Sequence, residues 1–186
     1  MATNFPTSLD TLTNPTSSDS LSSPSHASQH ANVNDAVEAL QAKVGVDGST
    51  VATSMDRKLP RGLMAENSTP TTFTATATPT TVLACSFTAQ ANRLYKFTFV
   101  CQSAMASTSG SRMQMTFVDD LGNQKGKAYQ GSLVYGNVLT FTNIDVLTAG
   151  SRTISLVAFR DAGSTAAFYA DAFSPLRLWV EDLGPY

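Results

Sequence analysis

The sequence predicts a mainly β protein, an antiparallel β-sandwich or jelly roll that is preceded by an extended N-terminal arm and a short coiled-coil helix. Three patterns predict this order of elements. A nine-residue repeat occupies the first 24 residues, apolar positions recur in steps of four and three over residues 25–45, and apolar and polar residues alternate from about residue 66 onward. The 186 residues are enough for one ordinary domain with additional segments.

The arm, residues 1–24, carries a repeat whose copies begin at Pro6, Pro15 and Pro24. Proline fixes φ and removes a hydrogen-bond donor, so an extended or turn-rich arm is favoured over a helix or a central strand. The Ser/Thr-rich composition also fits a disordered tail. A purely solvating tail does not need spaced apolar residues, however, and this arm has Phe5, Leu9, Leu12 and Leu21. We therefore expect it to be an attachment arm that lies along the surface of another protein.

Residues 25–45 predict a helix with one narrow seam. The seam positions alternate in steps of four and three: His26, His30, Val33, Val37, Leu40 and Val44. Ser25 is suited to the N-cap, and Gly45 is suited to end the helix. A helix of this length with a single apolar stripe is marginal in water by itself. We therefore expect an oligomer interface between copies of the chain, formed by Val33, Val37, Leu40 and Val44.

A hinge, residues 46–65, follows and has the signals for a second short helix. Ser49 is suited to the N-cap of that helix, and Pro60 is suited to end it. The basic residues Arg57, Lys58 and Arg61 are interpreted as a solvated cluster in this hinge.

The β-sandwich domain is predicted over residues 66–186. Tyr95, Phe97 and Phe99 alternate with Lys96 and Thr98, which is typical of a half-buried strand. About eight such short strands, separated by turn residues, favour a sandwich or jelly roll. The Thr-rich run over residues 69–81 contains two prolines, so it is predicted to be an edge strand or a lead-in.

The last predicted strand places a tryptophan outside the core. Leu178 and Val180 share one face, and Arg177, Trp179 and Glu181 share the other. An outward tryptophan among charges is either a subunit contact or a ligand platform. We expect Trp179 to lie against a neighbouring copy of the chain, with the ligand platform as the alternative.

The two cysteines are predicted to be reduced. Cys85 and Cys101 fall on the inward faces of two strands, and a hairpin centred near Ala91 would set the thiols several residues out of register. That separation is too large for disulfide geometry. Each cysteine is therefore expected to be a small apolar core residue.

The histidines and carboxylates provide no catalytic site in this sequence. His26 and His30 have the spacing at which two imidazoles share a metal, but no third ligand lies nearby and a polar layer in the seam explains them as well, so no metal or cofactor is expected. Both histidines precede the β domain, which excludes a Ser-His-Asp site within it. The carboxylates are expected to solvate turns and rims: Asp119, Asp120, Asp145, Asp161, Asp171, Glu181 and Asp182. We therefore expect no enzyme.

Composition excludes two classes of partner. The net charge is −2 and the charged residues make up 14% of the chain, so a cationic surface for nucleic acid is not expected. No apolar run is long enough to span a membrane. No Lys or Arg precedes Lys43, and no apolar run occurs there, so a secretory signal is not expected.

Residues 5–49 resemble the N-terminal segment of many tailed-phage fibre and minor structural proteins, and residues 180–185 are similar to the C-termini of small virion proteins from phages of actinobacteria. The resemblance implies a trimeric helical stalk, a distal β domain and attachment to a capsid or tail protein through the arm. The expected function is therefore a non-enzymatic virion structural protein made in the host cytoplasm, a short trimeric fibre or decoration spike on the head or tail. The alternative is a module at a fibre tip that binds host-surface glycan. Because most aromatic residues alternate inward, the structural role is favoured.

Overall fold

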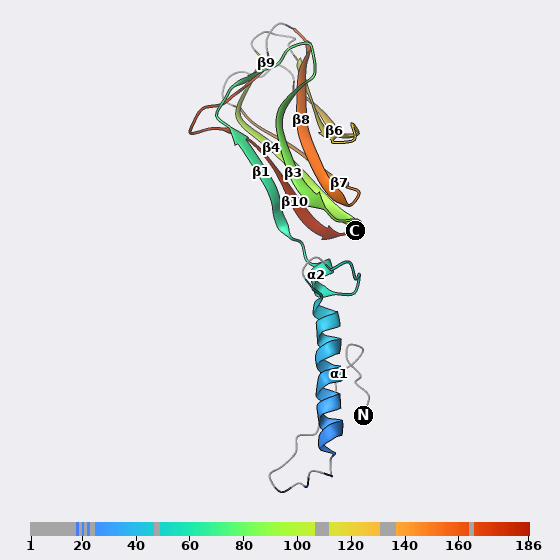
Figure 1. The fold of residues 1–186 in the computed structure, drawn as a ribbon. Helices are drawn as coiled ribbons and strands as arrows, with labels where there is room; N and C mark the ends of the chain where they lie inside the picture. The colour runs from blue at the N-terminus through green and yellow to red at the C-terminus, as the bar shows by residue number, and fades with distance from the viewer. Residues whose placement is uncertain are drawn as a thin grey trace. The chain divides into compact units, whose positions relative to one another are not determined.

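A computed structural model describes residues 18, 20, 22, 25–46, 49–106, 112–130, 137–163 and 166–186. The chain divides into two compact units, Met1–Leu59 and Pro60–Tyr186 (Figure 1). The four apolar residues assigned to the attachment arm, Phe5, Leu9, Leu12 and Leu21, lie outside the described residues. No helix in the described part of the chain is long and apolar enough to cross a lipid bilayer.

The first unit contains the helix that the spacing predicts. Helix α1 spans His26–Val44, and none of its residues is buried. It ends at Gly45, which has a φ of +86° and donates its backbone N–H to the carbonyl of Gln41. A Cβ at Gly45 would lie 2.8 Å from the Cβ of Ser54, so both the backbone conformation and the available space require glycine here. Ser25 occupies the N-cap position but makes no side-chain capping hydrogen bond.

The second helix, α2, spans only Met55–Lys58, and its N-cap is Ser54 instead of the predicted Ser49. The Ser54 hydroxyl accepts the backbone N–H of Arg57 at 3.2 Å. The helix starts later than predicted because a turn precedes it, in which the Ser54 N–H donates to the carbonyl of Val51. Ser49 is buried instead, and its backbone N–H donates to the carboxylate of Asp56 at 2.8 Å.

The prediction that the basic residues of the hinge are solvated is wrong for Arg57. Arg57 is only 7% exposed and lies on α2, which contacts α1 within the first unit. Lys58 is exposed, as the hinge interpretation predicts.

The second unit consists of antiparallel strands in two layers (Figure 1). The strands are β1 (Gly62–Thr69), β2 (Phe73–Thr74), β3 (Thr80–Ala89), β4 (Arg93–Ala106), β5 (Arg112–Asp119), β6 (Gln124–Gln130), β7 (Asn137–Val146), β8 (Gly150–Ala162), β9 (Ala166–Tyr169) and β10 (Leu176–Pro185). One sheet has the order β1-β10-β4-β7, and the other has the order β3-β8-β5-β6. The short β9 pairs with the second half of β4, and β2 pairs with β9. Eight long strands joined in this order form a jelly roll.

Two details of the predicted boundaries differ from the structure. Strand β1 begins at Gly62, within the segment assigned to the hinge, because residues from Gly62 onward already pair with β10. The Thr-rich run contains the last residue of β1, the two-residue strand β2 at a sheet edge and the start of β3, as its prolines favour.

The core lies between the two sheets. Tyr95, Phe97 and Phe99 of β4 are fully buried, which confirms the predicted alternation. The ring of Phe97 contacts Phe117 of β5 across the layers, with centroids 5.8 Å apart, and Phe117 stacks on Phe141 of β7 at 4.4 Å. Burying each of these side chains contributes about 1.5–3 kcal/mol relative to exposure, so the aromatic contacts between the layers are a main source of the domain's stability.

The predicted hairpin between the two cysteine strands is wrong. Strands β3 and β4 lie in different sheets, so Cys85 is opposite Ile154 of β8 and Cys101 is opposite Leu139 of β7. The connection crosses between the layers and includes Asn92 at a φ of +56°. Neither cysteine forms a disulfide, and both side chains are buried, as the sequence predicts.

Candidate functional site

The seam of α1 is exposed in the single chain. Its four apolar side chains retain about half of their accessible surface: Val33 51%, Val37 46%, Leu40 52% and Val44 46%. Their spacing places them on one side of the helix, each about one turn from the next. This side of α1 is therefore an apolar stripe about half of which remains exposed in the described part of the chain.

Two histidines occupy the N-terminal end of the same seam. The Nε2 atoms of His26 and His30 lie 3.1 Å apart, and their ring centroids are 4.4 Å apart at an interplanar angle of 83°. Both side chains are exposed. Among the described residues, no group of three or more His, Cys, Asp or Glu side chains is gathered closely enough to hold a metal ion.

Trp179 lies on the outer face of its sheet, as the alternation predicts. Leu178 and Val180 are fully buried, whereas Trp179 is only partly buried. Strand β10 is paired on both sides, by β1 and by β4, so Trp179 is in the interior of this surface and not at a sheet edge. Its cross-strand neighbours on the same face are Glu66 and Thr98.

The polar atom of Trp179 is satisfied within the chain. Its Nε1–H donates to the carboxylate of Glu181 at 3.2 Å, and Lys96 Nζ lies 2.8 Å from the same oxygen. The hydrogen bond from Lys96, followed by that from Trp179, lowers the pKa of Glu181 despite some burial. The indole is therefore oriented by a charged pair, and its ring remains available for an apolar contact.

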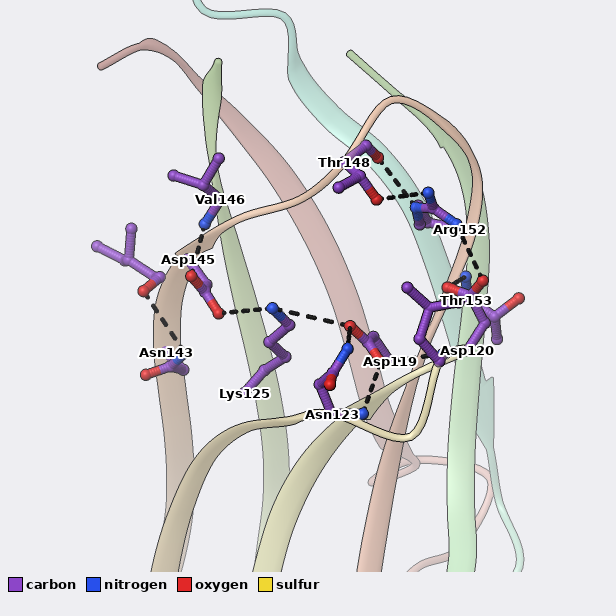
Figure 2. A network of polar contacts seen from close by, with 12 residues as sticks. Asp119, Asp120, Asn123, Lys125, Asn143, Asp145, Val146, Thr148, Arg152 and Thr153 are labelled. Carbon is purple, nitrogen blue, oxygen red and sulfur yellow. Dashed lines mark hydrogen bonds and ion pairs between the residues drawn. The ribbon is translucent and has the colours of Figure 1, made fainter. Parts of the chain in front are cut away.

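Figure 2 shows a polar network at the turn between β5 and β6. Asp119 accepts the backbone N–H groups of Leu121 at 3.0 Å and Asn123 at 2.8 Å, and it also accepts the side-chain amide of Asn123. Lys125 Nζ lies 3.7 Å from Asp119 and 3.1 Å from Asp145. Burial by itself raises the pKa of Asp119, but the hydrogen bonds from Asn123 and Leu121 and the charge of Lys125 together hold it below its usual value.

The same network holds the loop between β7 and β8. Arg152 pairs with Asp120 at 3.1 Å and donates to the carbonyl of Thr148 at 2.9 Å (Figure 2). Asp120 also accepts the backbone N–H of Thr153 at 3.3 Å. Asp119 binds the backbone of its own turn, as the turn role predicts, although its side chain is buried. Asp120 and Asp145 instead pair with cations of other strands, Arg152 of β8 and Lys125 of β6.

Two further carboxylates of the predicted set have similar local roles. Asp161 pairs with Arg112. Asp171 accepts the backbone N–H groups of Phe173 at 2.8 Å and Ser174 at 2.7 Å, which fixes the loop before β10.

The prediction that Asp182 is a rim carboxylate is wrong. It is 1% exposed and accepts two hydrogen bonds from the fully buried Arg93, Nε at 2.6 Å and Nη2 at 2.8 Å. The backbone N–H of Gly184 completes its contacts at 2.7 Å. The sequence contains the missed signal, because Asp182 continues the inward alternation of Leu178 and Val180, and an inward charge needs a partner.

The buried thiol of Cys85 is not an activated nucleophile. Burial raises its pKa to about 11, and its Sγ lies 3.2 Å from the carbonyl oxygen of Leu178. It therefore acts as a core residue.

Three solved structures illustrate what the fold is similar to. A family 35 carbohydrate-binding module from an environmental isolate has 14% sequence identity over 69% of this chain and 98% of its own, with a TM-score of 0.35. The viral particle of IBDV has 14% identity over 76% of this chain and 40% of its own, with a TM-score of 0.37. The enzymatically active domain of a tailspike protein from bacteriophage CBA120 has 14% identity over 76% of this chain and 22% of its own, with a TM-score of 0.27.

No family model matches the sequence, and no curated protein matches it. Likenesses at these identities and TM-scores assign neither a family nor a site residue to the chain. Its own geometry defines it as a jelly-roll domain preceded in sequence by a helix with an exposed apolar seam.

Proposed function

We propose that the protein is a non-enzymatic structural component of a phage virion, a short trimeric fibre or decoration spike anchored to the capsid or tail by its N-terminal arm. The observation that carries the proposal is the regular seam of α1, which is about half exposed along its whole length in the single chain. The resemblance of residues 5–49 to phage fibre and minor structural proteins supports the same organisation of arm, stalk and β domain.

The partner of the seam is proposed to be other copies of the chain. A helix of 19 residues with no buried residue is marginal in water, because most helix stability comes from packing. Identical helices in register bring like seam positions together, and three of the four apolar seam residues are β-branched valines. β-branched residues at both seam positions, as at Val33 and Val37, favour trimers or tetramers, whereas Val37 followed by Leu40 is a pattern of dimers. The trimer is therefore proposed from the resemblance to phage fibres, and the seam supports self-association.

Trp179 is proposed to be a second contact between copies. Truncating an interface tryptophan costs about 2 kcal/mol or more, so Trp179→Ala should raise the concentration at which the oligomer dissociates while leaving the monomer folded. Tyr129→Ala is the matched control, because Tyr129 is an aromatic residue of the other sheet and is 51% exposed. In the wild type, blue-shifted tryptophan emission that turns red on dissociation supports the contact. Emission that is already red and freely quenched in the oligomer contradicts it.

The attachment role of the arm is tested by deletion. A variant without residues 1–24 should fold and form the oligomer, but it should be absent from assembled particles of the phage that encodes it. Immunoblotting of purified particles made with the full chain or the deleted chain measures incorporation. Full occupancy by the deleted chain would refute anchoring through the arm.

Binding of host-surface glycan is the second candidate function, and one loop favours it. Phe173 is 94% exposed, and the hydrogen bonds from Phe173 and Ser174 to Asp171 fix the backbone that presents it. An exposed aromatic ring on a fixed loop is suited to stack on a sugar. A glycan array probed with the wild type, Phe173→Ala and the control Leu121→Ala tests this role, because Leu121 is an exposed apolar residue of a different loop. Binding that only Phe173→Ala loses supports the glycan module, and no binding by the wild type contradicts it.

A further inference from the structure

The histidine pair at the start of α1 has a geometry that its place in an apolar seam does not require. His26 and His30 are one helical turn apart, and each turns the same ring atom, Nε2, toward the other at 3.1 Å. Without a metal, this distance is that of a hydrogen bond in which one Nε2 carries the hydrogen and the other accepts it. Both nitrogens are near the surface, because both side chains are exposed.

The distance of 3.1 Å also suits two ligands of one metal ion. With metal–nitrogen bonds of about 2.0–2.1 Å, donors 3.1 Å apart subtend an angle of about 100° at the ion. This value lies between the angles of octahedral and tetrahedral coordination. Moving the one Nε2 hydrogen to Nδ1 of the same ring frees both Nε2 lone pairs without any change in net charge.

We propose that His26 and His30 of each chain bind a divalent transition-metal ion through both Nε2 atoms, and that copies of the chain share this ion in the oligomer. Imidazole ligands favour Zn²⁺, Ni²⁺, Cu²⁺ and Co²⁺ over Mg²⁺ and Ca²⁺. Sharing rests on the proposed function, because the 4-3 spacing places both histidines on the seam that copies would bring together. The histidines of neighbouring copies then supply the ligands that a single chain lacks.

The electrostatic cost of this position is small. A cation at a helix N-terminus is disfavoured by the partial positive charge of the helix dipole, and at an exposed site this effect is weak and screened by salt. The first turn of α1 contains no acidic residue, so the histidines are the groups that offer lone pairs to an ion there. Metal bonds to imidazole contribute more than the dipole removes.

The test uses the untagged full chain, stripped of metal with a chelator. Zn²⁺ is titrated by calorimetry and Co²⁺ by visible absorption, and sedimentation of the same samples gives the oligomeric state. His30→Gln removes one ligand and keeps a good helix former, and Ser28→Ala is the control in the same turn. We expect saturable Zn²⁺ binding and the Co²⁺ bands of a nitrogen-ligated site. The affinity should fall by at least about tenfold in His30→Gln, because loss of an outer-shell partner already costs that much. Ser28→Ala should keep the wild-type affinity.

The outcomes separate this inference from the proposed function. An oligomer that binds Zn²⁺ equally with and without His30 overturns the metal site and leaves the fibre proposal standing. A monomer that binds one Zn²⁺ per chain and loses it in His30→Gln supports chelation by the pair but refutes sharing and the proposed oligomer. An oligomer with fewer ions than chains, and with a dissociation midpoint that Zn²⁺ raises only when His30 is present, supports the whole inference.

Discussion

Replacing Val37 and Leu40 with aspartate should abolish self-association through α1 while the jelly roll stays folded. The two side chains are 46% and 52% exposed in the single chain, so about half of each remains to be buried by a partner. Because they belong to α1 in the first unit and make no part of the core of the second, their replacement leaves the β domain's own packing unchanged.

The size of the effect follows from the exposed fractions. Complete burial of one Val or Leu is worth about 1.5–3 kcal/mol, so the half that remains exposed is worth about 0.7–1.5 kcal/mol for each seam residue, or about 3–6 kcal/mol for the four residues of one chain. The double substitution removes about half of this gain. It also brings two carboxylates per chain into the seam, where desolvation costs several kcal/mol for each. No net driving force for association through α1 remains.

Multi-angle light scattering and sedimentation of the full chain measure the oligomer, and near-ultraviolet circular dichroism measures the packing of the β domain. The matched control is Ala31→Asp with Ala42→Asp, which adds the same two charges to exposed positions of α1 outside the seam. We expect the wild type and the control to be trimers and the seam variant to be a monomer. A trimer that survives Val37→Asp with Leu40→Asp would mean that the β domain alone holds the assembly, and a monomeric wild type would refute self-association altogether.

Three further predictions concern the jelly roll. Asp182→Asn should lower the free energy of unfolding by about 3–5 kcal/mol, because it leaves the buried guanidinium of Arg93 without its counter-charge. The control Glu181→Gln changes a pair that is about one-third exposed and should cost less than about 1 kcal/mol. Equal losses of the two variants in urea unfolding would contradict this reasoning. The pKa of Asp119 is lower in the folded state than in the unfolded chain, so its charge stabilises the fold above the unfolded pKa, and this contribution is lost as pH falls through the folded pKa. The difference in unfolding free energy between wild type and Asp119→Asn should therefore shrink between about pH 6 and pH 3. A constant difference would show that the charge does not contribute. With a pKa of about 11, roughly one Cys85 thiol in a thousand is ionised at pH 8, so a thiol reagent should react with it only after unfolding. Fast labelling of Cys85 in the native protein would show that this strand is accessible to solvent.

Local periodicity predicted the elements well. The 4-3 spacing that ends at Gly45 gave helix α1, and the alternation around Phe97 and Leu178 gave the buried face of two strands. These patterns are reliable because a helix or a strand face is determined by residues close together in the chain.

Pairing between strands could not be predicted in the same way. The short connection after Cys85 fits a hairpin as well as a crossing between sheets, and the choice depends on β8 and β10, which follow much later in the sequence. The ion pair of Arg93 and Asp182 was missed for the same reason, since the two residues are 89 positions apart and become neighbours only when β10 lies beside β4. Contacts of this kind are set by topology and not by local sequence.

The two units satisfy their chemical requirements differently, and we predict from this difference that the first unit controls the proposed assembly. In the jelly roll, the apolar faces pack on each other, the buried charge of Arg93 is neutralised by Asp182, and the turn carboxylate Asp119 binds the backbone of its own loop. In α1, the backbone is hydrogen-bonded within the helix, but about half of the surface of each apolar seam residue stays exposed in the described part of the chain. Substitutions in the β core should therefore act first on folding, and substitutions in the seam should act first on association. A seam variant that unfolds the β domain, or a core variant that changes only the oligomeric state, would show that this separation is wrong.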